Sequence, residues 1–442
     1  MAKRIIEQTC DLYRVDGTSV KRIADEFNEE LDRALDGEKS TLQILPSFLS
    51  APSGREEGYY LAVDFGGSNL RVMLVGLQGQ GSYEMIDQIS KPLKDPQGRY
   101  DYTTADTSGR EVFAFIADLA AEVWAKASPC KLGLTFSYPM QQDSICSARL
   151  LRWTKELKLR QTVGRDIGQM LGEALRDKGI DLRPAAIIND TVGVFLAGCY
   201  CDPAVCAGSI CGTGHNTCYL EPSRVTSSNQ VMIVNTEAGN FSPLPGNGYD
   251  QILDKATDDP GQQNMEKMVS GKYLGELMRI TLTDLGQKGY LPGYDPTLRI
   301  WCQPYSLPTE VLGWLGSKRS AERQQLANWA EENGIAFNQD GYSCLNLIST
   351  AILERAMKLI ASTYIAILKR NRQLNDKRQV IAVDGALFKN VPGFLAGIES
   401  ILQRELPDRA ISLIYTADGS SVGAAVAAAL AEDHICADRN QR

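Results

Sequence analysis

This chain of 442 residues lacks the motifs of several common enzyme classes. It has only two histidines, His215 and His434, and no G-x-S-x-G segment, which argues against a triad hydrolase. None of its cysteines forms a C-x-x-C pair and no histidine has zinc-ligand spacing, so we expect no metal ligands among the side chains. Neither a Walker A loop nor a G-x-G-x-x-G turn after a strand is present, so any nucleotide must be held differently.

The chain also lacks positive charge and long apolar runs. Its net charge of −8 argues against a nucleic-acid partner, although glycine-rich turns or a metal ion can still attract a small anion. No run of about 18 apolar residues exists and the first residues resemble no secretory signal, so no membrane partner is expected. Eleven cysteines, an odd number, in so long a chain are typical of reduced thiols, which predicts a cytoplasmic location.

What the sequence does contain is a mixture of strand and helix patterns. Apolar residues at three- and four-residue steps predict an amphipathic helix over 20–36 that ends at Gly37. Strand–turn–strand patterns cover 59–77 and 209–221, whereas 285–310 is rich in Gly and Pro and is expected to be irregular. This intermixing predicts an α/β class. Further expected elements are strands at 131–139 and 380–388, helices at 111–126 and 345–373, and a glycine turn opening a helix at 420–432.

Two glycine turns between strands are the first functional signal. The segments are DFGGSN at 64–69 and GTGHN at 212–216. Glycines let a ligand approach the backbone, and successive amides can form a nest for an anion. A single turn of this kind is more often a plain hairpin. Two such turns, with Asp-Gly pairs at 384 and 418, favour a nucleotide held between two lobes.

Asp190 is the second signal, because it follows the buried strand pattern of 185–188. A charge in that setting costs free energy unless it is paired. Its carboxylate could accept a hydroxyl proton as a general base, or Asp190 could simply cap a helix. The polar segments 151–157, 235–241 and 259–273 carry side chains that hydrogen-bond sugar hydroxyls, although each could also be a turn or a loop.

Eight segments in order between about 59 and 425 resemble the eukaryotic-type hexokinase family. They are VDFGGSNLRVMLV, LGLTFSYP with LRWTKELKL, IINDTVGVFLAG, CGTGHNTCYLE, VNTEAGNF, PGQQNMEKMVSGKYLGEL, VDGALFK and DGSSVGAA. The resemblance implies a two-lobed actin-like ATPase (ribonuclease H-like) fold with a cleft between a small domain, 58–189, and a large domain, 1–57 and 190–422. It also implies that the helix 423–442 packs back on the small domain.

The activity implied by the resemblance is ATP-dependent phosphorylation of the 6-hydroxyl of glucose, and of hexoses such as mannose and fructose, at the first step of glycolysis. Mg²⁺ would accompany ATP, and the chain would be a monomer or a homodimer. Asp190 matches the general base, and Lys155 is a further catalytic candidate. The sugar-binding matches are Ser137, Thr154, Lys155, Asn189, Asp190, Asn216, Glu237, Gln263 and Glu266. The nucleotide-binding matches are Asp64, Gly66, Gly67, Ser68, Asn69, Arg71, Gly212, Thr213, Gly214, Asp384, Gly385, Gly419 and Ser420.

The chain departs from the family pattern at a few positions. Glu156 and Ser421 stand where glycine is common, Ala386 stands where serine is common, and His215 occupies a variable position. Ala238 replaces a usual tryptophan beside Glu237, which predicts extra space near the sugar and leaves the hexose preference open. The alternatives are an inactive sugar sensor on the same fold, a filament-forming or chaperone-type ATPase, and a bacterial-type glucokinase, whose cysteine zinc motif is missing here.

Overall fold

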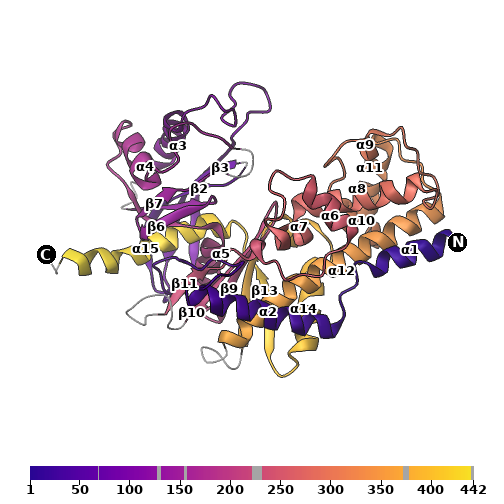
Figure 1. Cartoon of the computed structure of the whole chain (residues 1–442). Helices are drawn as coiled ribbons and strands as arrows, with labels where there is room; N and C mark the ends of the chain where they lie inside the picture. The colour runs from indigo at the N-terminus through magenta and orange to yellow at the C-terminus, as the bar shows by residue number, and fades with distance from the viewer. Residues whose placement is uncertain (68, 127–130, 154–156, 222–230, 372–377, 440–442) are drawn as a thin grey trace.

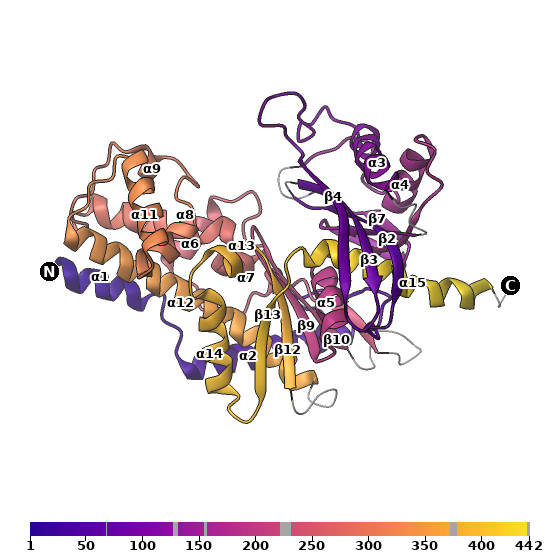
Figure 2. The ribbon, with the colours of Figure 1, turned by 180° about the vertical axis from the view of Figure 1, so that it is seen from behind.

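The chain folds into two α/β lobes that lie side by side (Figure 1). The computed structural model describes residues 1–67, 69–126, 131–153, 157–221, 231–371 and 378–439, with side chains through residue 431. Each lobe is built around its own sheet, and the expected α/β class is confirmed. Figure 2 shows the same arrangement from behind, with helix α1, Ala2–Asp11, and the last described turns of helix α15, Gly419–Arg439, at opposite sides of the molecule.

The smaller lobe contains a five-stranded sheet in the order β4-β3-β2-β5-β8. The β2, β3 and β4 strands are antiparallel neighbours, whereas β2, β5 and β8 run parallel. Parallel strands are buried on both faces, and β8 is accordingly buried along its whole length. The elements are β2 Glu57–Phe65, β3 Asn69–Gln78, β4 Tyr83–Pro92, α3 Gly109–Trp124, β5 Lys131–Phe136, β6 Met140–Ser144, β7 Ser147–Leu150, α4 Ile167–Arg176 and β8 Pro184–Ile188.

The larger lobe contains a six-stranded sheet in the order β1-β11-β10-β9-β12-β13. The β9, β12 and β13 strands are parallel, and the β9, β10, β11 and β1 strands are antiparallel neighbours. Both sheets therefore combine a parallel half with an antiparallel hairpin that contains a glycine turn. The strands are β1 Leu45–Pro46, β9 Val205–Cys211, β10 His215–Glu221, β11 Met232–Asn235, β12 Arg378–Asp384 and β13 Ala410–Tyr415.

Most helices of the chain belong to the larger lobe, where they surround the long helix α12, Gln339–Arg370. The buried Arg355 of α12 forms a two-pronged ion pair with Asp250, with both N–O distances 2.7 Å. The other helices are α1 Ala2–Asp11, α2 Gly17–Leu35, α6 Gly248–Lys255, α7 Asn264–Val269, α8 Gly271–Gln287, α9 Arg299–Cys302, α10 Glu310–Gly316, α11 Ser320–Glu332, α13 Ala386–Asn390, α14 Phe394–Glu405 and the 3-10 turn η1 Ala238–Asn240.

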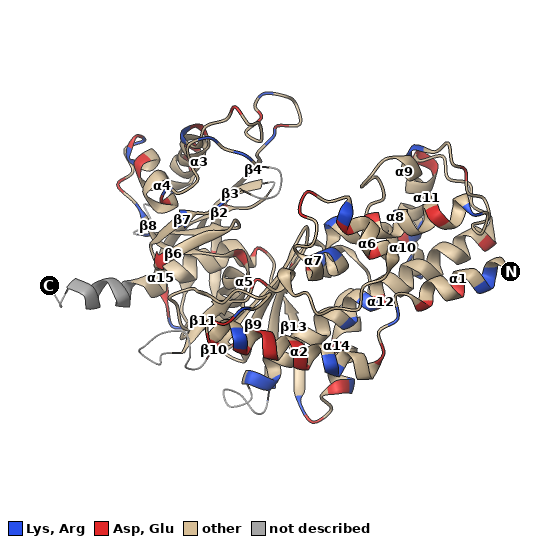
Figure 3. Cartoon of the chain, in the orientation of Figure 1, with Lys and Arg blue, Asp and Glu red and all other residues tan. Residues whose placement is uncertain are grey.

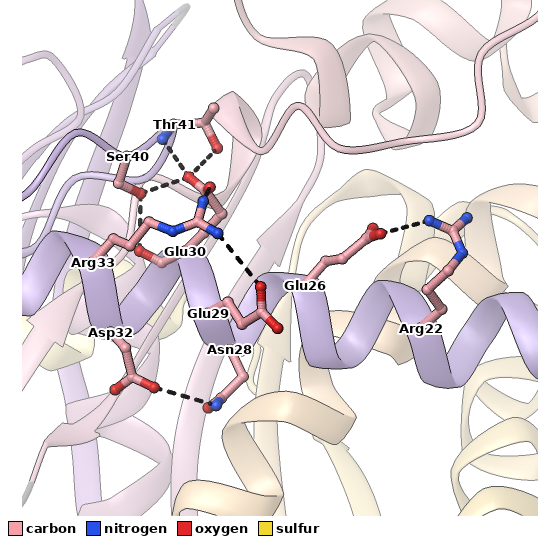
Figure 4. Close-up of polar contacts among 9 residues, drawn as sticks. All are labelled: Arg22, Glu26, Asn28, Glu29, Glu30, Asp32, Arg33, Ser40 and Thr41. Atoms are coloured by element: carbon pink, nitrogen blue, oxygen red, sulfur yellow. Dashed lines mark hydrogen bonds and ion pairs between the residues drawn. The ribbon is translucent and has the colours of Figure 1, made fainter.

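Helix α2 contains one buried carboxylate that its amphipathic pattern does not predict. Its buried Glu30 accepts hydrogen bonds from the backbone N–H of Thr41 (2.6 Å) and from the Ser40 hydroxyl (2.7 Å), as Figure 4 shows. Arg33 pairs with the same carboxylate. These contacts fix the chain between the end of α2 and strand β1, and so attach α2 to the larger sheet.

Two helices join the lobes, α5 Asp190–Cys201 and α15 Gly419–Arg439 (Figures 1 and 2). They cross backbone to backbone, since a Cβ at Gly423 would lie 2.0 Å from the carbonyl oxygen of Gly193. Helix α15 also presses on the smaller sheet, where a Cβ at Gly133 would lie 1.9 Å from the Ala424 carbonyl oxygen. Glycine is therefore required at these contacts for steric reasons.

The predicted elements are largely present. The helix expected over 20–36 is α2, and Gly37 follows it with φ +74°. The helix expected over 345–373 begins earlier, at Gln339, because the Asn338 side chain caps it by accepting from the Gly341 N–H. No helix in the described part of the chain is both long and apolar enough to cross a membrane. Acidic and basic positions are interspersed along the described helices (Figure 3).

Candidate active site

Asp190 lies in the first turn of α5, directly after strand β8 ends at Ile188. The helix cap is Asn189, whose side chain accepts from the Thr191 N–H at 3.0 Å, so the alternative role of Asp190 as the cap does not hold. The Thr191 N–H also lies 2.8 Å from Asp190 Oδ1, which orients that carboxylate. A helix N-terminus favours a negative charge, so the position suits an ionised base.

Glu237 is the centre of a hydrogen-bond network in the larger lobe. Its Oε1 accepts from Asn235 Nδ2 (2.7 Å) and from Asn216 Nδ2 (3.1 Å). The Asn216 Oδ1 in turn accepts from the Ala238 N–H, which ties strand β10 to the turn η1. The network extends to Thr191, which follows the predicted base in the chain. The Thr191 hydroxyl lies 3.2 Å from Asn235 Oδ1, and the Thr191 N–H donates to Asp190 Oδ1. Amide and carboxylate groups of this kind can donate to and accept from sugar hydroxyls.

Gln263 and Glu266 adjoin this network at the start of α7. The Glu266 carboxylate accepts from the His215 N–H at 3.0 Å. Gly239 is packed among these groups, because a Cβ there would lie 2.7 Å from Gln263 Oε1 and 3.3 Å from the Glu266 Cβ. The structure therefore brings together the four large-lobe residues predicted to bind sugar. These residues are Asn216, Glu237, Gln263 and Glu266.

The glycine turn of the larger lobe, Gly212–Gly214, lies against a second bare stretch of backbone. A Cβ at Gly385 would meet the Cys211 carbonyl at 2.5 Å and the Gly212 nitrogen at 2.8 Å. The Gly212 carbonyl accepts from the Gly271 N–H at 2.7 Å, which fixes the turn to α8. Backbone without side chains, at the end of two adjacent strands, suits close contact with phosphate groups.

Asp64 is a buried carboxylate of the smaller lobe, near the end of β2, and it is only 7% exposed. Its Oδ2 accepts from the hydroxyls of Ser420 (2.7 Å) and Ser421 (3.0 Å), both in the first turn of α15. Arg71 Nη1 lies 3.9 Å from the same oxygen and 3.3 Å from Asp418. Burial raises the pKa of Asp64, whereas Ser420, Arg71 and Ser421 lower it.

Asp384 ends strand β12 and directly precedes Gly385, which lies against the Gly212–Gly214 turn. Its Oδ1 accepts from the Gly385 N–H at 2.7 Å. Burial raises the pKa of Asp384 and opposes the effects of its hydrogen bonds. Gly419 is the first residue of α15, next to Ser420. The Thr416 N–H donates to the Val383 carbonyl at 2.9 Å, and Asp418 and Arg71 influence the pKa of Asp384, so the start of α15 lies near the end of β12.

Three residues at the site have left-handed backbone conformations that side chains seldom adopt. They are Glu237 (φ 49°), Gln263 (φ 54°) and Asp418 (φ 53°). Such conformations cost of order 1–3 kcal/mol each and persist where the surrounding structure enforces them. Here they turn the Glu237 and Gln263 side chains toward one cluster.

The other predicted residues fall in two groups. Ser137 follows β5, and its N–H donates to the Phe65 carbonyl, next to the turn that contains Gly66, Gly67 and Asn69. This turn closes the β2–β3 hairpin. Ser68, Thr154, Lys155 and the Glu156 departure lie outside the described residues.

The structure explains one departure from the family pattern. Ala238 is fully buried in the core of the larger lobe, and the extra space predicted beside Glu237 stays a prediction. His215 is also buried, and its Nδ1 lies 3.0 Å from the Ile210 carbonyl oxygen. Burial lowers its pKa to about 4, so His215 is neutral near pH 7 and is part of the packing.

The sequence interpretation missed two residues that shape the site, Asn235 and Ser421. Asn235 begins the quoted segment VNTEAGNF after its valine, and its position beside the predicted ligand Glu237 was the available signal. Ser421 was noted only as a departure. Its contact with Asp64 joins residues 357 positions apart, which no local pattern reveals.

Two α/β lobes, each with a glycine turn at the end of its central strands, define the two-lobed actin-like ATPase fold. The hexokinase family models match residues 5–200 and 206–430. The chain is 31% identical to rice hexokinase-1 over 97% of this chain and 91% of that protein. It is 32% identical to mouse hexokinase-3 over 97% of this chain, but spans only 47% of that relative's length.

A solved hexokinase from Schistosoma mansoni, complexed with glucose, superposes with a TM-score of 0.83 at 27% identity, covering 97% of this chain and 99% of that chain. The chain belongs to the hexokinase family. The family expected from the sequence motifs and its two-lobed fold are thereby confirmed.

Proposed function

We propose that this chain transfers the γ-phosphoryl group of ATP to the 6-hydroxyl of a hexose. The observation that carries the proposal is the network from Asp190 through Thr191 and Asn235 to Glu237. It connects a carboxylate suited to accept a hydroxyl proton with side chains suited to hold the rest of the sugar. The glucose complex of the Schistosoma mansoni relative supports glucose as the first substrate to test, followed by mannose and fructose.

Asp190 is the proposed general base. Its orientation by the Thr191 N–H and its place at a helix N-terminus favour a fixed, ionised carboxylate. It would take the proton from the sugar hydroxyl as that oxygen attacks phosphorus. Asn189, Asn216, Glu237, Gln263 and Glu266 would hold the remaining hydroxyls, together with Ser137 of the smaller lobe. Thr154 and Lys155 complete the proposed sugar ligands.

The nucleotide phosphates are proposed to lie between the two glycine turns. The backbones of Gly212 and Gly385 lie against each other, because a Cβ at Gly385 would be 2.8 Å from the Gly212 nitrogen. Backbone without side chains lets a phosphate group approach closely. Mg²⁺, when bound with ATP, would neutralise the phosphate charge and polarise the transferring group. On the protein side, Arg71 offers a positive charge, and Gly419 and Ser420 lie at the N-terminus of α15, where a negative charge is favoured. The same proposal includes Thr213, Asp384 and the β2–β3 turn.

The domain arrangement and setting belong to the same proposal. We place the small domain at 58–189 with helix 423–442 against it, and the large domain at 1–57 and 190–422. Contacts of α15 with β2, β5 and β8 support this division. Closure of the domains on sugar would exclude water as a competing phosphoryl acceptor. We propose a cytoplasmic monomer or homodimer, and the free state of the nine described cysteines supports a reducing compartment.

The test is sugar-dependent release of ADP from MgATP. Glucose, mannose, fructose, glucosamine and N-acetylglucosamine are assayed separately, with a sugar-free control for ATP hydrolysis. We expect turnover with glucose well above the control. Glucose binding by calorimetry without turnover on any sugar would instead establish the inactive sugar sensor.

A further inference from the structure

The first turn of α15 contains two adjacent serines whose hydroxyls both donate to one oxygen of Asp64. The distances are 2.7 Å from Ser420 Oγ and 3.0 Å from Ser421 Oγ to Asp64 Oδ2. Both serines are buried, and Ser421 is fully inaccessible to solvent. Water therefore does not replace the Ser421 hydroxyl readily if that hydroxyl is removed.

The Asp64 carboxylate depends on such donors because some of its other neighbours oppose its negative charge and one nearby cation favours it. Burial disfavours its charged form, and the Asp190 carboxylate on α5 acts in the same direction. Arg71 on β3 is the nearby cation, but it lies closer to Asp418, just before α15, than to Asp64. Tyr138, after β5, interacts electrostatically with Asp64 as a phenol whose own pKa is raised by burial.

The two serine hydroxyls are held in place by the backbone of α15. Thr135 Oγ1 donates to the Ser420 carbonyl at 2.7 Å, and the Ser421 N–H donates to the Asp418 carbonyl at 3.0 Å. The contact between Gly423 and Gly193 fixes the next turn against α5. Hydrogen bonds to an ionised carboxylate are stronger and shorter than neutral ones, so this rigid pair determines where the carboxylate points.

We propose that Ser421 is a positioning residue for the kinase reaction, which holds the Asp64 carboxylate beside the nucleotide phosphates as the second of two hydroxyl donors. The inference rests on the proposed function. Ser421 does not itself contact substrate in this proposal and acts only through Asp64.

The expected effect has a defined sign. Removal of the Ser421 hydroxyl removes a donor to the charged form of Asp64, so the pKa of Asp64 rises further. Activity that requires ionised Asp64 is then lost at a higher pH as the solution is acidified. We expect the acid limb of kcat/KM for ATP to move up by about one pH unit, equivalent to about 1.4 kcal/mol. At alkaline pH, kcat should return close to the wild-type value.

The experiment compares wild type, Ser421→Ala, Ser421→Gly and Ser421→Thr, with Ser362→Ala as the control. Ser362 is equally buried and donates to the Lys358 carbonyl in α12, away from the site. Turnover is measured from about pH 5.5 to 9, with melting temperatures recorded for each variant. We expect Ala and Gly to shift the acid limb, Thr to restore it, and the control and the KM for glucose to stay unchanged.

An unshifted acid limb and unchanged kcat/KM in folded Ser421→Gly would overturn the inference. Equal shifts in Ser421→Ala and Ser362→Ala would also overturn it, because the effect would then be general destabilisation. If wild type turns over no sugar, the proposed function fails separately. In that case MgATP affinity against pH, measured by calorimetry on wild type and Ser421→Gly, decides the inference: a shift supports it and identical curves reject it.

Discussion

The substitution Glu237→Gln tests whether sugar binding and nucleotide binding depend on different residues, because it changes little more than one atom of the side chain. Glu237 Oε1 accepts from Asn235 and Asn216, and a glutamine Oε1 can keep both bonds. The change removes the negative charge and turns the other oxygen into a donor. A hydrogen bond to a charged group contributes roughly 1.5–3 kcal/mol, so we expect the Kd for glucose to rise roughly 10–150-fold.

The assay is calorimetric titration of glucose and, separately, of MgATP into the same protein preparation. The MgATP affinity should change little, because the glycine turns proposed to hold the phosphates consist of other residues. Glu237→Ala is the matched comparison, since it leaves the Asn235 and Asn216 amides without their acceptor. It should lower the melting temperature more than Glu237→Gln does. Equal losses of sugar and nucleotide affinity in Glu237→Gln would refute this division of roles.

Three further changes test other parts of the structure. Asp190→Ala should retain glucose binding and lose turnover by roughly 10²–10⁴-fold in stopped ADP-release assays, and near-normal turnover would remove the base assignment. Gly133→Ala should destabilise the protein by about 1–3 kcal/mol or more in urea unfolding, because the new Cβ would lie 1.9 Å from a carbonyl oxygen, whereas Gly248→Ala, which meets nothing within 4 Å, should not. His215 has a folded pKa of about 4 against a usual 6.5, so the unfolded chain takes up its proton first as pH falls. Wild-type stability should therefore drop between pH 6.5 and 4 by up to about 3 kcal/mol more than that of His215→Gln, and parallel pH curves would contradict the burial argument.

Local sequence signals predicted the parts of the fold that local chemistry determines. The DFGGSN and GTGHN turns lie between antiparallel strands as expected, because glycines and small polar residues close hairpins on their own. The start of α12 at Gln339 was missed, since its cap Asn338 precedes the apolar periodicity.

Contacts made by the tertiary fold could not be predicted in the same way. The pairing of Asp64 with Ser421 depends on how α15 docks on the smaller sheet, and the packing of Ala238 depends on the core around it. The family resemblance supplied candidate residues, but it could not supply a contact that the family pattern does not contain. The left-handed conformations of Glu237 and Gln263 likewise depend on the surrounding tertiary structure, because neither residue type prefers that conformation locally.

The glycine contact between α5 and α15 has a mechanical consequence. Gly193 and Gly423 meet as bare backbone, so a side chain at Gly423 would collide with the facing helix. The two helices are therefore fixed to each other at a point a few residues from both Asp190 and Ser420. Any movement of one lobe against the other is then expected to carry the proposed base and the start of α15 together.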